Sequence, residues 1–254
     1  MRPILIQGAH PPEVDKLVRL FLPGCEEHCI DGFKFWDGMM QLNHVACRVV
    51  VSITGIGLAL ASASVVIAKQ HFNPIAIINQ GIAGGHTRDV QVGDIIVGEY
   101  CVNLNSFKTP FASQGAGSNS LTWKPKKSRG SGGGHEPIGD TEDMSYIDRK
   151  KIKADAGLLT ACKSIDSTCR VIFGGIGTSE TWNSEVDRID YLHALFGTLC
   201  EEMEAIAVAQ IAEIFRIPFI SIRVISNNIM NHGAYALSVT ETCQDHVLRV
   251  VESF

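Results

Sequence analysis

Three glutamates stand within four positions in the segment Cys200-Glu201-Glu202-Met203-Glu204-Ala205. The segment precedes an apolar stretch that we expect to be a helix, and acidic side chains near a helix N-terminus are stabilised by the helix dipole. A carboxylate can also accept hydrogen bonds from two neighbouring hydroxyls, as on a sugar. Glu204 is therefore a candidate sugar-binding residue, and the dipole interpretation is the alternative.

A charged residue and a polar triplet end another apolar stretch, in the order Arg223-Val224-Ile225-Ser226-Asn227-Asn228. Polar groups at the end of a buried strand are costly unless they find partners. A binding site at this point is one interpretation, and an ordinary turn is the other.

Three glycine-bearing segments directly follow predicted strands: Gly8-Ala9-His10, Gly55-Ile56-Gly57 and Gly81-Ile82-Ala83-Gly84-Gly85. Ligands of open α/β sheets bind at the carboxyl ends of the strands, where small residues allow a close approach to the backbone. We therefore expect the three segments to form one pocket. None of them fits the dinucleotide fingerprint or the P-loop, which disfavours both classes.

The elements that must position these residues alternate along the chain, which predicts an α/β fold. Runs dense in Val and Ile predict strands at residues 2–8, 48–54, 75–79, 94–97, 170–173 and 218–226. Apolar positions at helical spacing, or long apolar runs, predict helices at residues 12–21, 58–71, 186–195, 203–215 and 241–253. Several strands lack a polar/apolar alternation, as expected for strands covered on both faces.

Residues 105–143 interrupt this alternation, because they are rich in Gly and Ser and contain the run Gly130–Gly134. This composition predicts a mobile surface loop. Its basic cluster could contact a phosphate, and solvated charges are the alternative. The cluster consists of Lys124, Lys126, Lys127 and Arg129.

The overall composition is that of a globular chain of 254 residues, with 45% hydrophobic and 19% charged residues. Its formal charge of −5 argues against proteins that coat nucleic acid or bind anionic membranes. No apolar run approaches the roughly 20 residues that span a bilayer, and no signal peptide is recognisable, so we expect a cytoplasmic protein. The eight scattered cysteines predict reduced thiols rather than disulfides or a metal site.

Taken together, these motifs resemble the nucleoside phosphorylase superfamily, and within it the methylthioadenosine/S-adenosylhomocysteine nucleosidase branch. Their order and approximate spacing span nearly the whole chain. The matching motifs are Gly8-Ala9-His10-Pro11-Pro12-Glu13, Thr54-Gly55-Ile56-Gly57, Asn79-Gln80-Gly81-Ile82-Ala83-Gly84-Gly85, Val92-Gly93-Asp94-Ile95-Ile96-Val97, Glu202-Met203-Glu204-Ala205 and Ile222-Arg223-Val224-Ile225-Ser226-Asn227.

The resemblance implies a single three-layer α/β domain over residues 1–254, with a central twisted mixed β-sheet flanked by helices. It implies a homodimer that needs neither metal nor organic cofactor. The implied activity is hydrolysis of the N-glycosidic bond of a purine nucleoside similar to methylthioadenosine or S-adenosylhomocysteine, within nucleoside catabolism and methionine salvage. The products would be the free base and a ribose derivative.

The resemblance also implies roles for individual residues. Glu13 would activate the attacking water, Met203 and Glu204 would hold the ribose, and Trp182 would stack on the base. Anionic carboxylates near the sugar would stabilise the oxocarbenium character that develops in the transition state. The remaining implied substrate-binding residues are Ala83, Gly84, Asn183, Glu202 and Ser226.

The sequence departs from the family at Asn227, where the family has an aspartic acid that faces the purine. An amide can donate a hydrogen bond to N7 of the base, but it cannot deliver a proton at neutral pH. General acid catalysis contributes about 10²–10⁴-fold. A different base such as a 6-oxopurine, a different proton route and weak catalysis are all open.

Two other functions are open as well. A phosphorylase would need a cation for phosphate, but the matching position is Asn79, and the nearby Arg88 has the character of a solvent-facing loop arginine. Water is therefore the favoured nucleophile. A nucleoside-binding protein that has lost efficient chemistry is the other alternative, because of Asn227.

Overall fold

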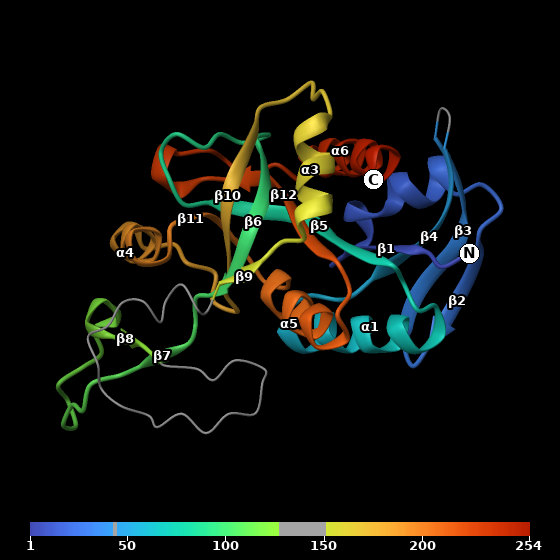
Figure 1. Cartoon of the computed structure of the whole chain (residues 1–254). Coiled ribbons are helices and arrows are strands. Elements are labelled where there is room, and N and C mark those ends of the chain that lie inside the picture. Colours follow the sequence, from blue (N-terminus) through green and yellow to red (C-terminus); the bar gives the residue numbers. More distant parts are fainter. Residues whose placement is uncertain (43–44, 127–150) are drawn as a thin grey trace.

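The central strands bury both of their faces against helices, as the three layers in Figure 1 show. In β1 (Ile4–Gly8), Ile4 and Ile6 belong to one hydrophobic cluster and Leu5 to another. The first cluster includes α3 (Ala156–Ser164) and α6 (Thr240–Ser253), and the second includes α1 (Leu58–His71) and α5 (Ala205–Phe215). This arrangement confirms the predicted fold class, with a mixed sheet flanked by helices.

The computed structural model describes residues 1–42, 45–126 and 151–254. Within these residues, the remaining α-helix is α4 (Val186–Phe196). The other strands are β2 (Glu26–Ile30), β3 (Phe33–Leu42), β4 (Val45–Ile53), β5 (Ala76–Gly85), β6 (Ile95–Asn103), β7 (Phe107–Lys108), β8 (Lys124–Pro125), β9 (Ile152–Lys153), β10 (Val171–Thr178), β11 (Thr198–Glu202) and β12 (Phe219–Asn227).

Within the described residues, one ten-stranded sheet runs in the order β11-β10-β6-β12-β5-β1-β4-β3-β2, with β9 beside β6. Strands β1, β4, β5 and β12 pair in parallel, whereas β2 and β3 form an antiparallel extension. Strand β11 also pairs with β5, so five strands close on one another. This closure places β11 and β12 on opposite sides of β5. The motifs found in the sequence lie at the ends of these three strands.

All six predicted strands and four of the five predicted helices are confirmed, with ends shifted by a few residues. The prediction of a regular helix at residues 12–21 is wrong. These residues form a 3₁₀ turn, Pro11–Glu13, and a π-helical segment, Leu17–Phe21. The tight first turn folds the Glu13 carboxylate back onto the backbone amides of Ala9 and His10, which a straight helix starting at residue 12 would not do.

Two further expectations need correction. The segment Gly81–Gly85 is the end of strand β5 rather than a turn after it. In the predicted loop, residues 105–126 are partly ordered by β7 and β8, which pair in antiparallel fashion. Phe107 of β7 contacts the ring of Phe196 edge-on, so this part packs against the domain. Lys127, Arg129 and residues 130–143 lie outside the described residues.

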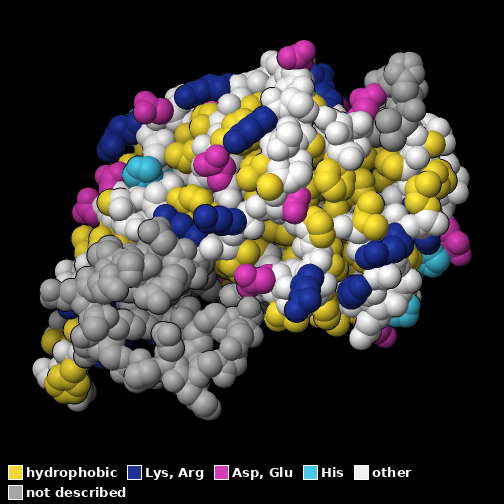
Figure 2. Space-filling model, in the orientation of Figure 1, with side chains coloured by type: hydrophobic (Ala, Val, Ile, Leu, Met, Phe, Trp, Pro, Cys, Tyr) yellow, Lys and Arg dark blue, Asp and Glu magenta, His cyan; other side chains and the backbone are white. Residues whose placement is uncertain are grey.

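Basic and acidic side chains are interspersed on the face shown in Figure 2, among hydrophobic side chains over the middle of the sheet. No helix of the described ranges is both long and apolar enough to cross a membrane.

Candidate active site

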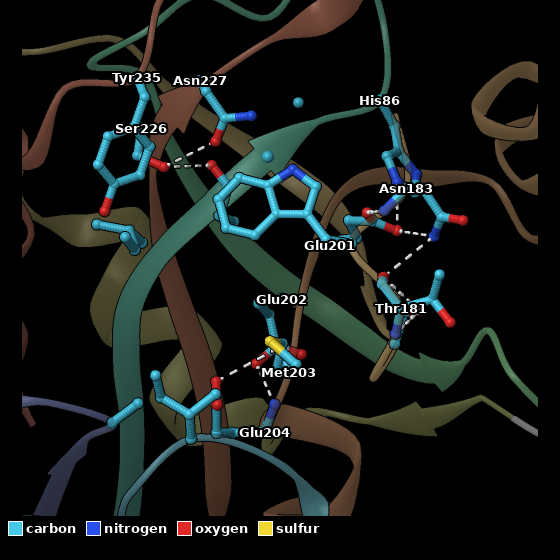
Figure 3. Close-up of a pocket in the computed structure, with 18 of the residues that line it drawn as sticks. His86, Thr181, Asn183, Glu201, Glu202, Met203, Glu204, Ser226, Asn227 and Tyr235 are labelled. Atoms are coloured by element: carbon cyan, nitrogen blue, oxygen red, sulfur yellow. Dashed lines mark hydrogen bonds and ion pairs between the residues drawn. The ribbon is translucent and has the colours of Figure 1, made fainter. Parts of the chain in front are cut away.

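A cavity of about 270 Å³ lies where β5, β11 and β12 meet (Figure 3). Its lining brings together every site residue predicted from the sequence, from segments far apart in the chain. These residues are Glu13, Ala83, Gly84, Trp182, Asn183, Glu202, Met203, Glu204, Ser226 and Asn227.

Backbone amides from two strand ends hold the carboxylate of Glu13. Its Oε2 accepts a hydrogen bond from the amide of Ala9 at 2.5 Å, and its Oε1 accepts one from the amide of Ile82 at 2.9 Å. The side chain is only 3% exposed. Glu13 is therefore a fixed, buried acceptor at one end of the cavity.

Gly81 explains how this carboxylate fits against β5. A Cβ atom at this position would lie 2.7 Å from Cδ of Glu13, which is closer than real side chains approach. Only glycine lets the strand and the carboxylate come together here.

Glu204 lies at the start of α5 and reaches across the cavity to a second glycine segment. Its Oε1 accepts a hydrogen bond from the amide of Gly57 at 2.9 Å. Burial, followed by the charge of Glu202, raises the pKa of Glu204 to about 8, although Arg223 and the Gly57 amide act in the opposite direction. This raised pKa favours the protonated carboxyl group of Glu204 at neutral pH.

Glu202 lies in the cavity wall, where protein donors engage both of its carboxylate oxygens. Its Oε2 accepts hydrogen bonds from the amides of Glu204 and Ala205 and from the guanidinium of Arg223, and its Oε1 accepts one from Thr178 at 2.5 Å. The dipole interpretation of the acidic run thus holds for Glu202, whose carboxylate caps α5. Glu202 itself ends strand β11 rather than opening the helix.

Ser226 and Asn227 lie at a bulge in β12. The register against β5 pairs Ile225 with Ala83 and Asn227 with Gly84, so Ser226 is the extra residue. Its hydroxyl donates to Oδ1 of Asn227 at 3.0 Å. A bulge re-aims side chains, and here it turns both polar residues toward the cavity.

Two aromatic residues border the cavity. The indole of Trp182 is 65% exposed and lies 6.3 Å from the ring of Tyr235, measured between centroids. Tyr235 was not predicted from the sequence, because it follows the end of β12 in a segment without apolar periodicity. The signal available in the sequence was an aromatic residue shortly after a strand that ends in candidate site residues.

A second polar group on the cavity wall was also missed. Glu201 accepts hydrogen bonds from both donors of Asn183, the backbone amide at 3.0 Å and Nδ2 at 2.6 Å. Nε2 of the buried His86 lies 3.3 Å from Oε2 of Glu201. The sequence did place His86 directly after the glycine segment and Glu201 inside the acidic run, but their mutual contact depends on the pairing of β11 with β5.

The positions considered for phosphate binding do not supply a cation to the cavity. Asn79 is buried and accepts a hydrogen bond from Arg223. Arg88 has a side chain that is 64% exposed and lies outside the cavity, 3.9 Å from Asp190. Among the described residues that line the cavity, none is Lys or Arg.

Comparisons with known proteins agree with this architecture. The 5'-methylthioadenosine/S-adenosylhomocysteine nucleosidase of Geobacillus kaustophilus is 28% identical over 226 residues, which cover 87% of this chain and 83% of that protein. The nucleosidase of Colwellia psychrerythraea, solved in complex with adenine, superposes with a TM-score of 0.75 at 22% identity and covers 99% of this chain and 95% of its own.

A mutant of the Helicobacter pylori nucleosidase with Asn in place of Asp, solved with 5'-methylthioadenosine in its active site, gives a TM-score of 0.76 at 19% identity over 100% of both chains. At these identities the structural likeness shows the fold. The family model described as the phosphorylase superfamily matches residues 3–254. The superfamily that the motifs resemble is therefore confirmed, and the chain belongs to the phosphorylase superfamily.

Proposed function

We propose that this protein hydrolyses the N-glycosidic bond of a purine nucleoside. The proposal agrees with the chain's similarity to a protein named 5'-methylthioadenosine/S-adenosylhomocysteine nucleosidase. The products are the free base and a ribose derivative. The observation that carries the proposal is the placement of Glu13 and Glu204 in one cavity without a lysine or arginine among its described lining residues.

Glu13 is the general base in this proposal. Ala9 and Ile82 each donate to a different oxygen of its carboxylate. A carboxylate oxygen can accept more than one hydrogen bond, so Oε1 can also accept a proton from a water molecule. The backbone donors fix the direction of attack, since neither oxygen can rotate away without losing them.

Met203 and Glu204 hold the ribose. A protonated carboxyl group can donate to one hydroxyl of the sugar and accept from its neighbour. As the glycosidic bond breaks, positive charge develops on the ribose. The buried carboxylate of Glu13, and that of Glu204 when it has lost its proton, stabilise this charge more than they stabilise the neutral substrate.

Trp182 and Asn227 bind the base. Stacking on an indole fixes the plane of a purine. The Nδ2 group of Asn227 donates to N7 and stabilises the negative charge that the leaving base acquires, without transferring a proton. The departing base takes its proton from solvent water, and Glu13 returns to solvent the proton that it accepted.

Water is the nucleophile rather than phosphate. A phosphorylase needs a cation that binds phosphate, usually an arginine with its two parallel donors. Neither Asn79 nor Arg88 provides one in the cavity.

The decisive experiment measures release of free base from methylthioadenosine, S-adenosylhomocysteine, adenosine, inosine and guanosine, each with and without phosphate. Release that does not depend on phosphate is the expected result. Release that requires phosphate would instead assign a phosphorylase and direct attention back to Arg88.

A catalytically weakened nucleoside-binding protein is the second candidate, and Asn227 is the observation that favours it. The Helicobacter pylori mutant with Asn in place of Asp contains 5'-methylthioadenosine in its active site. Tight binding of a nucleoside by this protein without any release of base would establish the second candidate.

The setting of this activity is part of the proposal. All eight cysteines are free, which suits the reducing cytoplasm. Ile56, Trp182 and Tyr235 are exposed beside the cavity, where the second subunit of a homodimer would cover them. We propose that the chain forms one domain and that it acts in nucleoside catabolism and methionine salvage. Sedimentation equilibrium of the purified protein tests the homodimer.

A further inference from the structure

We infer that two buried glutamines, Gln244 and Gln80, are positioning residues for Glu13. Their side-chain amides take the place of two main-chain hydrogen bonds and so hold the irregular turn that carries this carboxylate. The inference rests on the proposed function, in which Glu13 is the general base. It depends on the hydrogen bonds of the two glutamines and on the elements from which they come.

The side chain of Gln244 is inserted into a helical turn between Pro12 and Lys16. In a regular α-helix the amide of Lys16 would donate to the carbonyl of Pro12, four residues earlier. Here Oε1 of Gln244 accepts the hydrogen bond of the Lys16 amide at 3.0 Å, and its Nε2 donates to the Pro12 carbonyl at 3.0 Å. A side chain inserted in this way opens the helix locally.

The next hydrogen bond of the turn is replaced as well. The amide of Leu17, whose helical partner would be the carbonyl of Glu13, donates instead to Oε1 of Gln244 at 3.1 Å. The carbonyl of Glu13 accepts a hydrogen bond from Nε2 of Gln80 at 2.5 Å. The main-chain pattern resumes one residue later, at the amide of Val18, so the opening is confined to the surroundings of Glu13.

The two replaced hydrogen bonds fix both peptide groups that flank Cα of Glu13. The carbonyl of Pro12 belongs to the peptide group before this atom, and the carbonyl of Glu13 belongs to the one after it. With both groups held, the Cα–Cβ bond has a set direction, and the carboxylate reaches the amides of Ala9 and Ile82. The glutamines therefore act on the carboxylate through the backbone.

Both glutamines come from elements that are fixed in the core. Gln244 lies on α6 with a fully buried side chain, and Gln80 lies on the central strand β5 and is 1% exposed. Asp245, the next residue on α6, forms an ion pair with Lys16 at 2.7 Å, which fastens the same turn. The turn and α6 lie side by side in Figure 1. A residue that positions another must itself be held rigidly, and both glutamines meet this condition.

Gln80 also carries an unpaired acceptor. Within the described residues its Oε1 has no hydrogen-bond partner, although the atom is buried. An unpaired buried acceptor lowers stability. An apolar side chain would avoid this cost but could not donate to the carbonyl of Glu13, so the donor of Gln80 is the part of the side chain with a role.

Hydrogen exchange measured by NMR in the variant Gln244→Met tests the positioning directly. Methionine keeps the length of the side chain but has no amide group. The amides of Ala9 and Ile82 donate to the carboxylate of Glu13, so faster exchange at these two amides reports a displaced carboxylate. We expect their exchange to accelerate by at least about tenfold.

Two outcomes of this measurement would overturn the inference. Faster exchange confined to residues 16–17, whose amides lose their own acceptor, would show an effect on the turn alone. Leu158→Ala is the control for a general loss of stability, because it removes a buried side chain from α3. It should leave exchange at Ala9 and Ile82 within about twofold of the wild type. Equal acceleration in both variants would show general unfolding instead of a displaced carboxylate.

Kinetics test whether Gln244 acts through Glu13. Gln244→Met should lower kcat for base release by at least about tenfold, because a displaced catalytic group loses rate steeply, and should leave binding of 9-methyladenine unchanged. In a Glu13→Gln background the same substitution should change the remaining rate by less than about twofold, since no base is left to position. A tenfold loss in both backgrounds would show that Gln244 acts by another route and would overturn the inference.

Gln80→Met is the second variant, and it keeps the inference testable if Gln244→Met does not fold. It removes the hydrogen bond to the carbonyl of Glu13. The same acceleration of exchange at Ala9 and Ile82 is expected. Unchanged exchange at both amides in folded Gln80→Met protein would contradict the role given to Gln80.

The exchange measurement separates this inference from the proposed function, because it needs no turnover. Faster exchange at Ala9 and Ile82 in Gln244→Met, in a protein that releases base from no nucleoside, would support the positioning of Glu13 and refute the nucleosidase proposal. Base release by the wild type together with unchanged exchange in Gln244→Met would refute the positioning and leave the nucleosidase proposal intact.

Discussion

Arg223 and Glu202 form an ion pair beneath the cavity, with 2.5 Å between Nη2 and Oε2, and their side chains are 2% and 1% exposed. The same Oε2 accepts the amides of Glu204 and Ala205. The ion pair therefore ties β12 to the junction between β11 and α5, and this junction sets the direction of the Glu204 side chain.

Removal of the cation from this pair should destabilise the fold strongly. Arg223→Met leaves the carboxylate of Glu202 buried without its charged partner, which typically lowers the free energy of unfolding by about 3–5 kcal/mol. Urea denaturation followed by circular dichroism measures the change. Arg88→Met is the control, since Arg88 is exposed, and its unfolding free energy should change by less than about 1 kcal/mol. Equal effects of the two variants would contradict a special role for the buried pair.

Loss of the general base should abolish most of the hydrolysis. Glu13→Gln keeps the shape of the side chain but removes the group that takes the proton from water, so we expect kcat for base release to fall by at least about 100-fold. Binding of 9-methylpurines should persist, because Glu13 serves the sugar side of the reaction. Unchanged hydrolysis in the purified variant would show that another residue activates the water.

The layers of the fold could be predicted from the sequence because the central strands are runs dense in apolar residues. In β12, Phe219, Ile220, Ile222, Val224 and Ile225 are all buried, and such a run is typical of a strand that is covered on both faces. The edge strand β2 was missed for the opposite reason. Glu26, Glu27 and His28 give it no apolar pattern, and its pairing with β3 alone defines it.

The candidate site was predictable where a residue stands in a recognisable local motif, as Glu13 and Glu204 do. Glu201 was visible only as part of an acidic run, because its contacts in the cavity wall depend on the pairing of β11 with β5 and on the imidazole of His86. Such contacts join segments that are distant in sequence and leave no periodic pattern. The folded register alone brings them together.

Introduction of an acid at the base site should accelerate the reaction of adenine nucleosides. Asn227→Asp provides a group that can protonate N7 of the leaving base, and we expect base release from methylthioadenosine to rise by about 10- to 100-fold. Asn119→Asp, at an exposed 3₁₀ turn, makes the same chemical change elsewhere and should have no effect. A rate that does not rise in Asn227→Asp would mean that this side chain does not limit departure of the base.

His246 should make the protein sensitive to acid. It is buried on α6, both ring nitrogens lack a partner, and burial followed by the charge of Arg249 lowers its pKa to about 4. Between pH 6.5 and 4 the unfolded chain binds the proton and the folded chain does not, so stability falls as the pH is lowered through this window.

His246→Leu removes this titration. The loss of unfolding free energy between pH 7.5 and pH 5 should therefore be smaller by about 2 kcal/mol than in the wild type, as measured by urea denaturation. His71→Leu, at the exposed end of α1, is the control and should retain the wild-type difference. A wild-type pH difference in His246→Leu would show that other groups cause the acid sensitivity.

Ionisation of Glu204 should have opposite effects on the stability and on the activity of the protein as the pH rises. Its pKa is raised to about 8 in the folded protein, chiefly by burial and by the charge of Glu202. Between the ordinary value of about 4.5 and this raised value, the folded chain keeps a proton that the unfolded chain loses, so stability falls as the pH rises. The ionised form, by contrast, stabilises a developing oxocarbenium ion better than the neutral form.

Glu204→Gln separates the two effects. The variant is neutral at every pH, so its midpoint of thermal unfolding should exceed that of the wild type by roughly 10 °C at pH 8.5 and should approach it near pH 5. Its hydrolysis should lose the rise in kcat that the wild type is expected to show between pH 7 and pH 9. If the two proteins unfold at the same temperature at both pH values, Glu204 does not carry the proton in the folded state, and its role at the sugar is that of a permanent anion.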